Sequence, residues 1–168
     1  MHRAVAAMIA AVLGLSSAAA MAGSADGVGG LLPQPKAAPA PLQLPAPPRA
    51  AELVRVTQRG ELAFFIDLAS LQRASATTVR YTLVARSAHG ADNVGYETLD
   101  CARPAWRVEA LWLGGNWQRQ PDAPWIPVVP GLGGVHGTLY ADELCSGSMV
   151  DGTIEQLRAR LRRDARLP

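Results

Sequence analysis

The feature that most constrains the fold of this chain is an alternation of apolar and polar residues over 78–87, TVRYTLVARS. Val79, Tyr81 and Leu83 would lie on one face of a strand, and mostly polar side chains would lie on the other. A repeat of two is what a half-buried β-strand requires, because successive side chains point to opposite faces of a sheet. The run lies within 64–101, so we expect the domain to be organised around a sheet.

Further strand patterns flank this run on both sides. We predict strands at 52–57, 62–68, 93–101, 106–113 and 117–120. After 62–68, the residues Asp67 to Ala76 are expected to form a turn and connector. Because the other links are short and rich in glycine, consecutive strands should pair as an antiparallel meander.

The helical patterns come late in the chain. Residues 121–137 are interrupted by prolines and are expected to be irregular, and 135–145 is a candidate short helix. Residues 153–166 predict a clear helix, with Thr153 as its cap and Gln156 three residues on. The expected fold class is therefore α+β: an antiparallel meander of four to six strands with a C-terminal helix packed on it.

The N-terminus predicts a targeting segment. Residues 1–22 start with a short positive stretch, continue with an uncharged apolar stretch and end in Ala-Met-Ala. This pattern is typical of a signal peptide cleaved before Gly23, although an uncleaved anchor is an alternative interpretation. We therefore expect an exported protein, in the periplasm or alternatively on the outer-membrane surface.

A proline- and alanine-rich segment, 23–50, separates this signal from a single domain at 51–168. Proline fixes φ and donates no backbone hydrogen bond, so 33–48 predicts an extended polyproline-II segment in a disordered linker. It is interpreted as a spacer, as a ligand for an aromatic groove, or as a passive leader.

The chain has two cysteines, Cys101 and Cys145. In an oxidising compartment two cysteines most often pair, so we expect one disulfide, with free thiols as the alternative. A metal site would need more ligands at close spacing, and we expect no metal or other cofactor.

Several motifs together resemble a known family. FFIDLASL at 64–71 is followed by VRYTLVARS, by a segment ending in Tyr96-Glu97 and by a cysteine. Trp117 and the His136 to Cys145 stretch continue the pattern. The chain is similar to the cryptic neisserial protein 1-like (CNP1-like) family, which implies a small proteobacterial envelope protein of uncharacterised function. A fainter similarity to the surface adhesin protein E implies an antiparallel sheet with a C-terminal helix.

Composition and motifs argue against some functions and give little support to others. A net charge of +2 argues against non-specific nucleic-acid binding, which needs clustered phosphate neutralisation. Asp67 with Ser70 and His136 with Asp142 or Glu143 are the catalytic candidates, and each set lacks further partners in the sequence. The Gly131-Leu-Gly-Gly stretch lacks the context of a phosphate loop. We predict no catalytic, cofactor-binding or metal-binding residues.

The remaining candidates form a partner surface. Trp125 lies among prolines and is the tryptophan expected to be most exposed. Arg158 and Arg162 belong to an arginine-rich terminal helix that could contact membrane lipid. We therefore expect a non-enzymatic binding or interaction module for an unknown envelope protein or surface component. The alternatives are a surface-displayed adhesin and, third, a small hydrolase.

Overall fold

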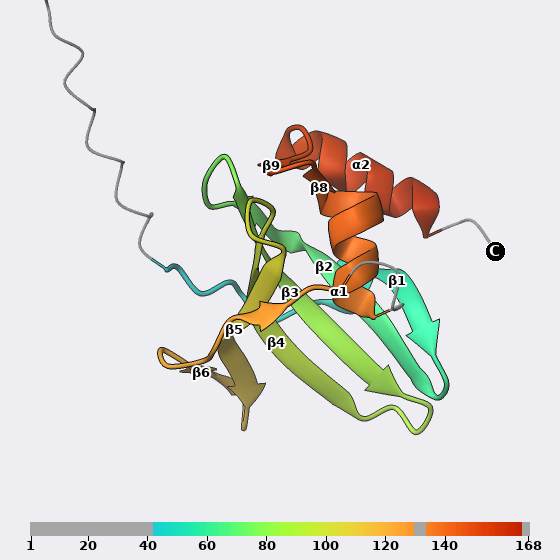
Figure 1. Cartoon of the computed structure of the whole chain (residues 1–168). Coiled ribbons are helices and arrows are strands. Elements are labelled where there is room, and N and C mark those ends of the chain that lie inside the picture. The colour runs from blue at the N-terminus through green and yellow to red at the C-terminus, as the bar shows by residue number, and fades with distance from the viewer. Residues whose placement is uncertain (1–41, 130–133, 166–168) are drawn as a thin grey trace, which may run out of the picture. The chain divides into compact units, whose positions relative to one another are not determined.

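The computed structural model describes residues 42–129 and 134–165 (Figure 1). They form a short helical turn, a sheet, a small hairpin and further helices near the end of the chain. The strands are β1 (Leu53–Arg59), β2 (Leu62–Arg73), β3 (Thr78–Ser87), β4 (Asp92–Asp100), β5 (Ala105–Leu113), β6 (Asn116–Arg119), β7 (Ile126–Pro127), β8 (Cys145–Ser146) and β9 (Met149–Val150). The helices are η1 (Ala50–Glu52), α1 (Val135–Thr138), the π-helical η2 (Leu139–Leu144) and α2 (Ile154–Asp164).

The strands β1 to β6 pair in chain order, each antiparallel to the next. β7 also pairs with β5, beside Ala105 and Trp106. The hairpin between β5 and β6 turns through Gly114 and Gly115, whose φ values of 58° and 83° strongly favour glycine. The predicted antiparallel meander with a C-terminal helix and one disulfide is confirmed.

β2 is longer than its sequence pattern predicts. The expected turn from Asp67 to Ala76 is wrong, because the strand continues to Arg73. Between Asp67 and Gln72 the register with β3 shifts. There the Ser70 hydroxyl donates to the Asp67 carbonyl and accepts the N–H of Thr82, which replaces ladder hydrogen bonds across the irregularity.

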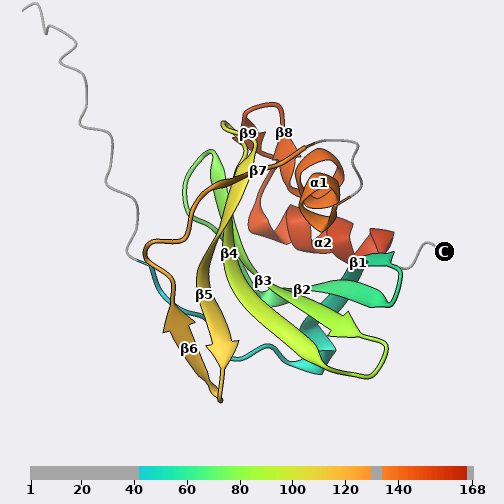
Figure 2. The same cartoon turned by 60° about the horizontal axis from the view of Figure 1, so that its bottom comes forward.

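The helices pack on one face of the sheet, which we call the first face (Figure 2). Alternation on β3 turns Val79, Tyr81 and Leu83 to this face, as predicted. Full burial of a large apolar side chain stabilises a fold by roughly 1.5–3 kcal/mol, so this layer is the main core. Its buried members include Ile66, Leu68, Leu99, Val135, Leu139, Leu144, Leu157 and Leu161.

A disulfide bond and a helix cap hold the helical layer in place. The disulfide Cys101–Cys145 joins the residue after β4 to the first residue of β8. α2 begins with the predicted cap: the Thr153 hydroxyl accepts the N–H of Gln156, and the Gln156 side chain accepts the N–H of Thr153. Both devices fix the segment that covers the first face of the sheet.

Candidate functional site

The face of the sheet opposite the helices, the second face, carries aromatic and polar side chains. On β4 the alternation that buries Leu99 on the first face turns Tyr96 to the second face. Trp117 on β6 lies opposite Trp112 on β5, and their ring centroids are 5.3 Å apart. The Trp117 ring also lies 6.1 Å from that of Tyr96. Three aromatic rings therefore form a continuous surface across β4, β5 and β6.

An extended segment before η1 lies on this surface, and we call residues 42–49 the proline strap. Figure 2 shows it crossing the sheet on the side away from the helices. The indole Nε1 of Trp117 donates to the carbonyl of Pro45 at 2.8 Å, and Arg119 donates to the carbonyl of Leu42 at 3.0 Å. Because proline offers no N–H, carbonyl oxygens are the groups through which such a segment is bound.

A small pocket of about 60 Å³ lies between the proline strap and β2. Asp67 lines it beside Pro45 and Arg49, and its Oδ1 accepts the N–H of Ala69. Burial raises the pKa of Asp67 above its usual range, while the nearby Arg49 acts in the opposite direction. The structure thus places the predicted Asp67 and Ser70 beneath the strap, in a structural role at the β2 irregularity.

His136 has a different partner from those considered in the sequence. Its Nε2 lies 2.8 Å from Glu97 Oε2, and its ring stacks on Trp106 with centroids 3.5 Å apart. Sequence reasoning missed Glu97 because it lies 39 residues away, and no local spacing signals such a pair. Tyr81, opposite Glu97 on β3, is fully buried. Burial, and to a lesser extent the charge of Glu97, raises the pKa of Tyr81 well above its usual range.

Asp142 and Glu143 do not join His136. Asp142 is exposed, whereas Glu143 is buried, and burial raises the pKa of Glu143. Ser70 bonds to Asp67 and Thr82, whereas His136 contacts Glu97 and Trp106 under the helices. The residues of the predicted hydrolase alternative are therefore distributed over the two faces of the sheet and do not meet.

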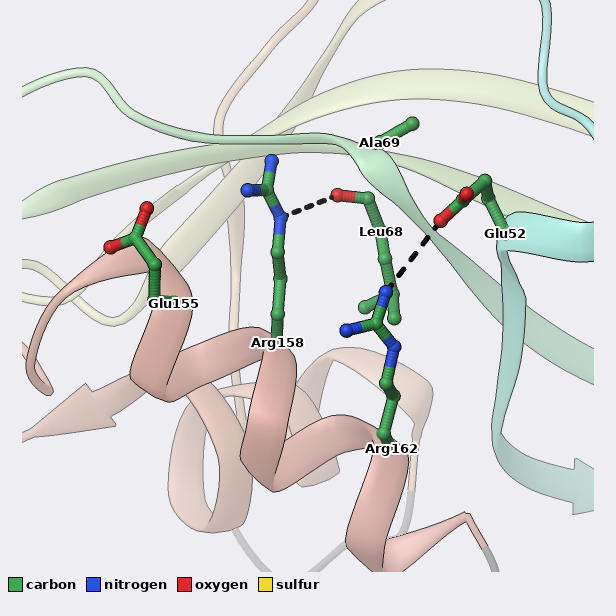
Figure 3. Close-up of a pocket in the computed structure, with 6 residues that line it drawn as sticks. All are labelled: Glu52, Leu68, Ala69, Glu155, Arg158 and Arg162. Carbon is green, nitrogen blue, oxygen red and sulfur yellow. Dashed lines mark hydrogen bonds and ion pairs between the residues drawn. The ribbon is translucent and has the colours of Figure 1, made fainter.

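The three residues of the predicted partner surface lie at separate places. Trp125 is 37% exposed, and the guanidinium groups of Arg107 and Arg103 lie 5.0 and 5.7 Å from its ring centroid. Arg158 and Arg162 instead line an open pocket of about 430 Å³ between α2 and the β1–β2 side of the sheet (Figure 3). No contact within the described residues joins Trp125 to these two arginines.

Within this pocket the two arginines have different roles. Arg158 donates to the carbonyl of Leu68 at 2.9 Å (Figure 3). It also donates to the carbonyl of Leu71 at 3.3 Å, and both carbonyls lie where β2 departs from β3. Arg162 lies 3.8 Å from Glu52 and its side chain is 54% exposed. Arg158 therefore supports the fold, and Arg162 is the member available to a partner or to lipid. Membrane contact through this helix stays a prediction.

Two further properties of the described residues concern other kinds of site. None of the helices there has the length and apolar character needed to cross a membrane. Those residues also hold no group of three or more histidine, cysteine, aspartate or glutamate side chains placed to bind a metal ion. The aromatic contacts and the bonds to the strap make the second face the candidate site.

Comparison with known proteins identifies the family. The profile of the CNP1-like family matches residues 34–162, which is well over half of the chain. The chain belongs to the CNP1-like family. The matched region of this CNP1-like chain starts before the proline strap and includes it. No curated protein and no solved structure gave a match. The family and the disulfide together suggest an exported protein.

Proposed function

We propose that the domain is a non-enzymatic binding module of the cell envelope whose second face holds extended, proline-rich segments. The observation that carries this proposal is the 2.8 Å hydrogen bond from Trp117 Nε1 to the carbonyl of Pro45. Grooves that recognise polyproline-II segments combine aromatic walls with donors for free carbonyls, because the segment is preformed and lacks N–H groups. Trp112, Trp117 and Tyr96 supply the walls, and Trp117 and Arg119 supply the donors.

The chain's own strap is the occupant in this structure, so a partner segment must displace it. A tethered segment acts at an effective concentration in the millimolar range for a short connection. The strap therefore excludes ligands that bind the second face weakly, and only a partner segment that binds this face more tightly can displace it. The strap also lies within the family match at 34–162, which supports its assignment to the domain and not to a passive leader.

The non-enzymatic part of the proposal is supported by the positions of the reactive side chains. The Ser70 hydroxyl is held by the Asp67 carbonyl and the Thr82 N–H, at 2.7 and 2.8 Å. His136 lies against Glu97 and Trp106 on the other face, so it cannot act as a base toward Ser70.

We place the module in the periplasm, with display on the outer-membrane surface as the alternative. Protease added to intact cells tests this directly, with a known periplasmic protein as the control. Protection until the outer membrane is opened is expected for a periplasmic domain. Cleavage while the control survives would move the domain to the surface and favour the adhesin alternative.

The binding proposal is tested with a fluorescent peptide of residues 42–49 and the whole exported chain. In one variant the strap is weakened by Leu44→Ser with Pro45→Ser, which removes two apolar side chains and the fixed φ of one proline but keeps the chain length. This variant should bind the peptide more tightly than the unaltered chain, measured by fluorescence anisotropy. Adding Trp117→Phe should weaken binding up to about tenfold, because one hydrogen bond contributes roughly 0.5–1.5 kcal/mol.

The matched control is Trp125→Phe, which removes an indole N–H away from the strap. It should leave the affinity for the peptide unchanged. Absence of binding at millimolar peptide in the strap variant would overturn the proposal. If the unaltered chain elutes as a dimer and the strap variant as a monomer, the face holds the strap of a second copy and not a partner segment.

A further inference from the structure

Arg80, in the middle of the sheet on β3, is a largely buried cation to which the described residues offer no carboxylate partner. The residue is only 8% exposed, and its buried Nε has no hydrogen-bond partner among those residues. Across the described residues its guanidinium makes no hydrogen bond and no ion pair with a carboxylate. A buried charge without compensation is costly, so a group of opposite charge is expected to complete the site.

The surroundings of Arg80 are polar. The register of the sheet places Gln72 of β2 on one side of it and Thr98 of β4 on the other, with Arg107 of β5 next in the row. All four side chains therefore belong to the second face. The Gln72 amide donates to the hydroxyl of Tyr96, which joins this row to the aromatic surface under the strap.

The other charges of this region are already paired. Glu109 accepts two hydrogen bonds from Arg107, at 2.9 and 3.1 Å, and a third from Thr98. Asp100 is held by Arg103 at 3.0 Å. These two pairs are neutral, so Arg80 leaves the row with one uncompensated positive charge. Neither carboxylate lies within ion-pair distance of Arg80.

We propose that Arg80 binds an oxyanion, a carboxylate or a phosphate group, carried by the ligand of the second face. The planar guanidinium can offer two parallel N–H donors to either group, and such charge-assisted pairs are strong when water is excluded. This inference rests on the proposed function for its location, and adds an anionic group to the ligand's chemistry.

The test measures the thermal midpoint of the whole exported chain against sodium phosphate and, separately, sodium acetate, with sodium chloride keeping ionic strength constant. A ligand that binds only the folded state raises the midpoint with its concentration. Both anions should raise it if the site takes any oxyanion. A rise with one alone assigns the group as phosphate or as carboxylate.

Variants tie the effect to this residue. Arg80→Met should abolish the anion-dependent rise, and should leave the midpoint in chloride unchanged or higher because an uncompensated buried charge is removed. Arg80→Lys keeps a charge but lacks the fork, and should reduce the rise. Arg55→Met, which changes an exposed arginine of β1, should keep the full response.

Two results would overturn the inference. One is the lack of any anion-dependent rise in the unaltered chain, and the other is an undiminished rise in Arg80→Met or Arg80→Lys. If Arg80→Met does not fold, Arg80→Lys provides the same test. The anion experiment contains no peptide, so a missing anion response does not bear on the peptide-binding experiment. A failure of peptide binding likewise does not change the interpretation of the anion response.

Discussion

Removal of the disulfide is the perturbation whose magnitude follows most directly from the structure. The bond joins Cys101 to Cys145 across 44 residues of sequence, and both cysteines are buried. The loop it closes contains β5, β6, β7 and the short helices α1 and η2. In the double variant Cys101→Ala/Cys145→Ala, this loop is free to expand in the unfolded chain.

The size of the effect comes from the entropy of that loop. Closing a loop of this length removes unfolded-state entropy equivalent to about 4 kcal/mol at 25 °C. Since small domains are stable by roughly 5–15 kcal/mol, the loss takes a large fraction of the total free energy of unfolding. The two missing sulfur atoms add to the loss by leaving space in the core.

Urea unfolding followed by tryptophan fluorescence measures this loss. With a slope of roughly 1–3 kcal/mol per molar urea, the midpoint should fall by between about 1.3 and 4 M. The unaltered chain in reducing agent keeps both sulfur atoms and should show the loss due to the bond alone, which separates the bond from the substitutions. A loss below about 1 kcal/mol with an unchanged slope would contradict this entropic effect, because the loop would then be constrained without the bond.

Three further predictions concern stability. Arg158→Ala should lower the free energy of unfolding in urea by about 1.5–3 kcal/mol, because the charged donor to two β2 carbonyls is lost. Arg162→Ala should lower it by under about 1 kcal/mol, and equal losses would contradict the structural role given to Arg158 alone. Thr153→Ala should cost about 1 kcal/mol by removing the cap of α2, and retention of full thermal stability would contradict that role. Burial raises the pKa of Asp67, so the folded state binds this proton more tightly than the unfolded state, and the resulting stabilisation is lost as pH rises through the raised pKa. The free energy of unfolding of Asp67→Asn, relative to the unaltered chain, should therefore increase from pH 4 to pH 7. A difference that stays constant over this range would contradict the raised pKa.

The strands could be predicted where their pattern was local. The run 78–87 coincides with β3, because alternating burial is written into successive residues. The continuation of β2 was missed because Leu68 to Leu71 do not alternate, and the chain is held there by Ser70 bonding to Thr82 on the neighbouring strand. An irregularity stabilised by tertiary contacts leaves no periodic signal.

The candidate site was less accessible to sequence reasoning. The proline-rich segment and the tryptophans were both recognised, but Trp117 and Pro45 lie 72 residues apart and nothing in either stretch indicates the other. A polyproline-II segment has no apolar repeat that would mark a buried face. The Glu97–His136 pair was missed for the same reason, since it forms only when α1 covers the sheet.

The second face holds the proline strap through the indole of Trp117, and this contact can be measured directly. The most direct test is the hydrogen-exchange rate of each tryptophan Nε1–H, measured by NMR on the whole chain. We expect slow exchange at Trp117 compared with the exposed Trp125, and loss of that protection in Leu44→Ser/Pro45→Ser. Exchange at Trp117 as fast as at Trp125, or protection unchanged in the strap variant, would contradict it.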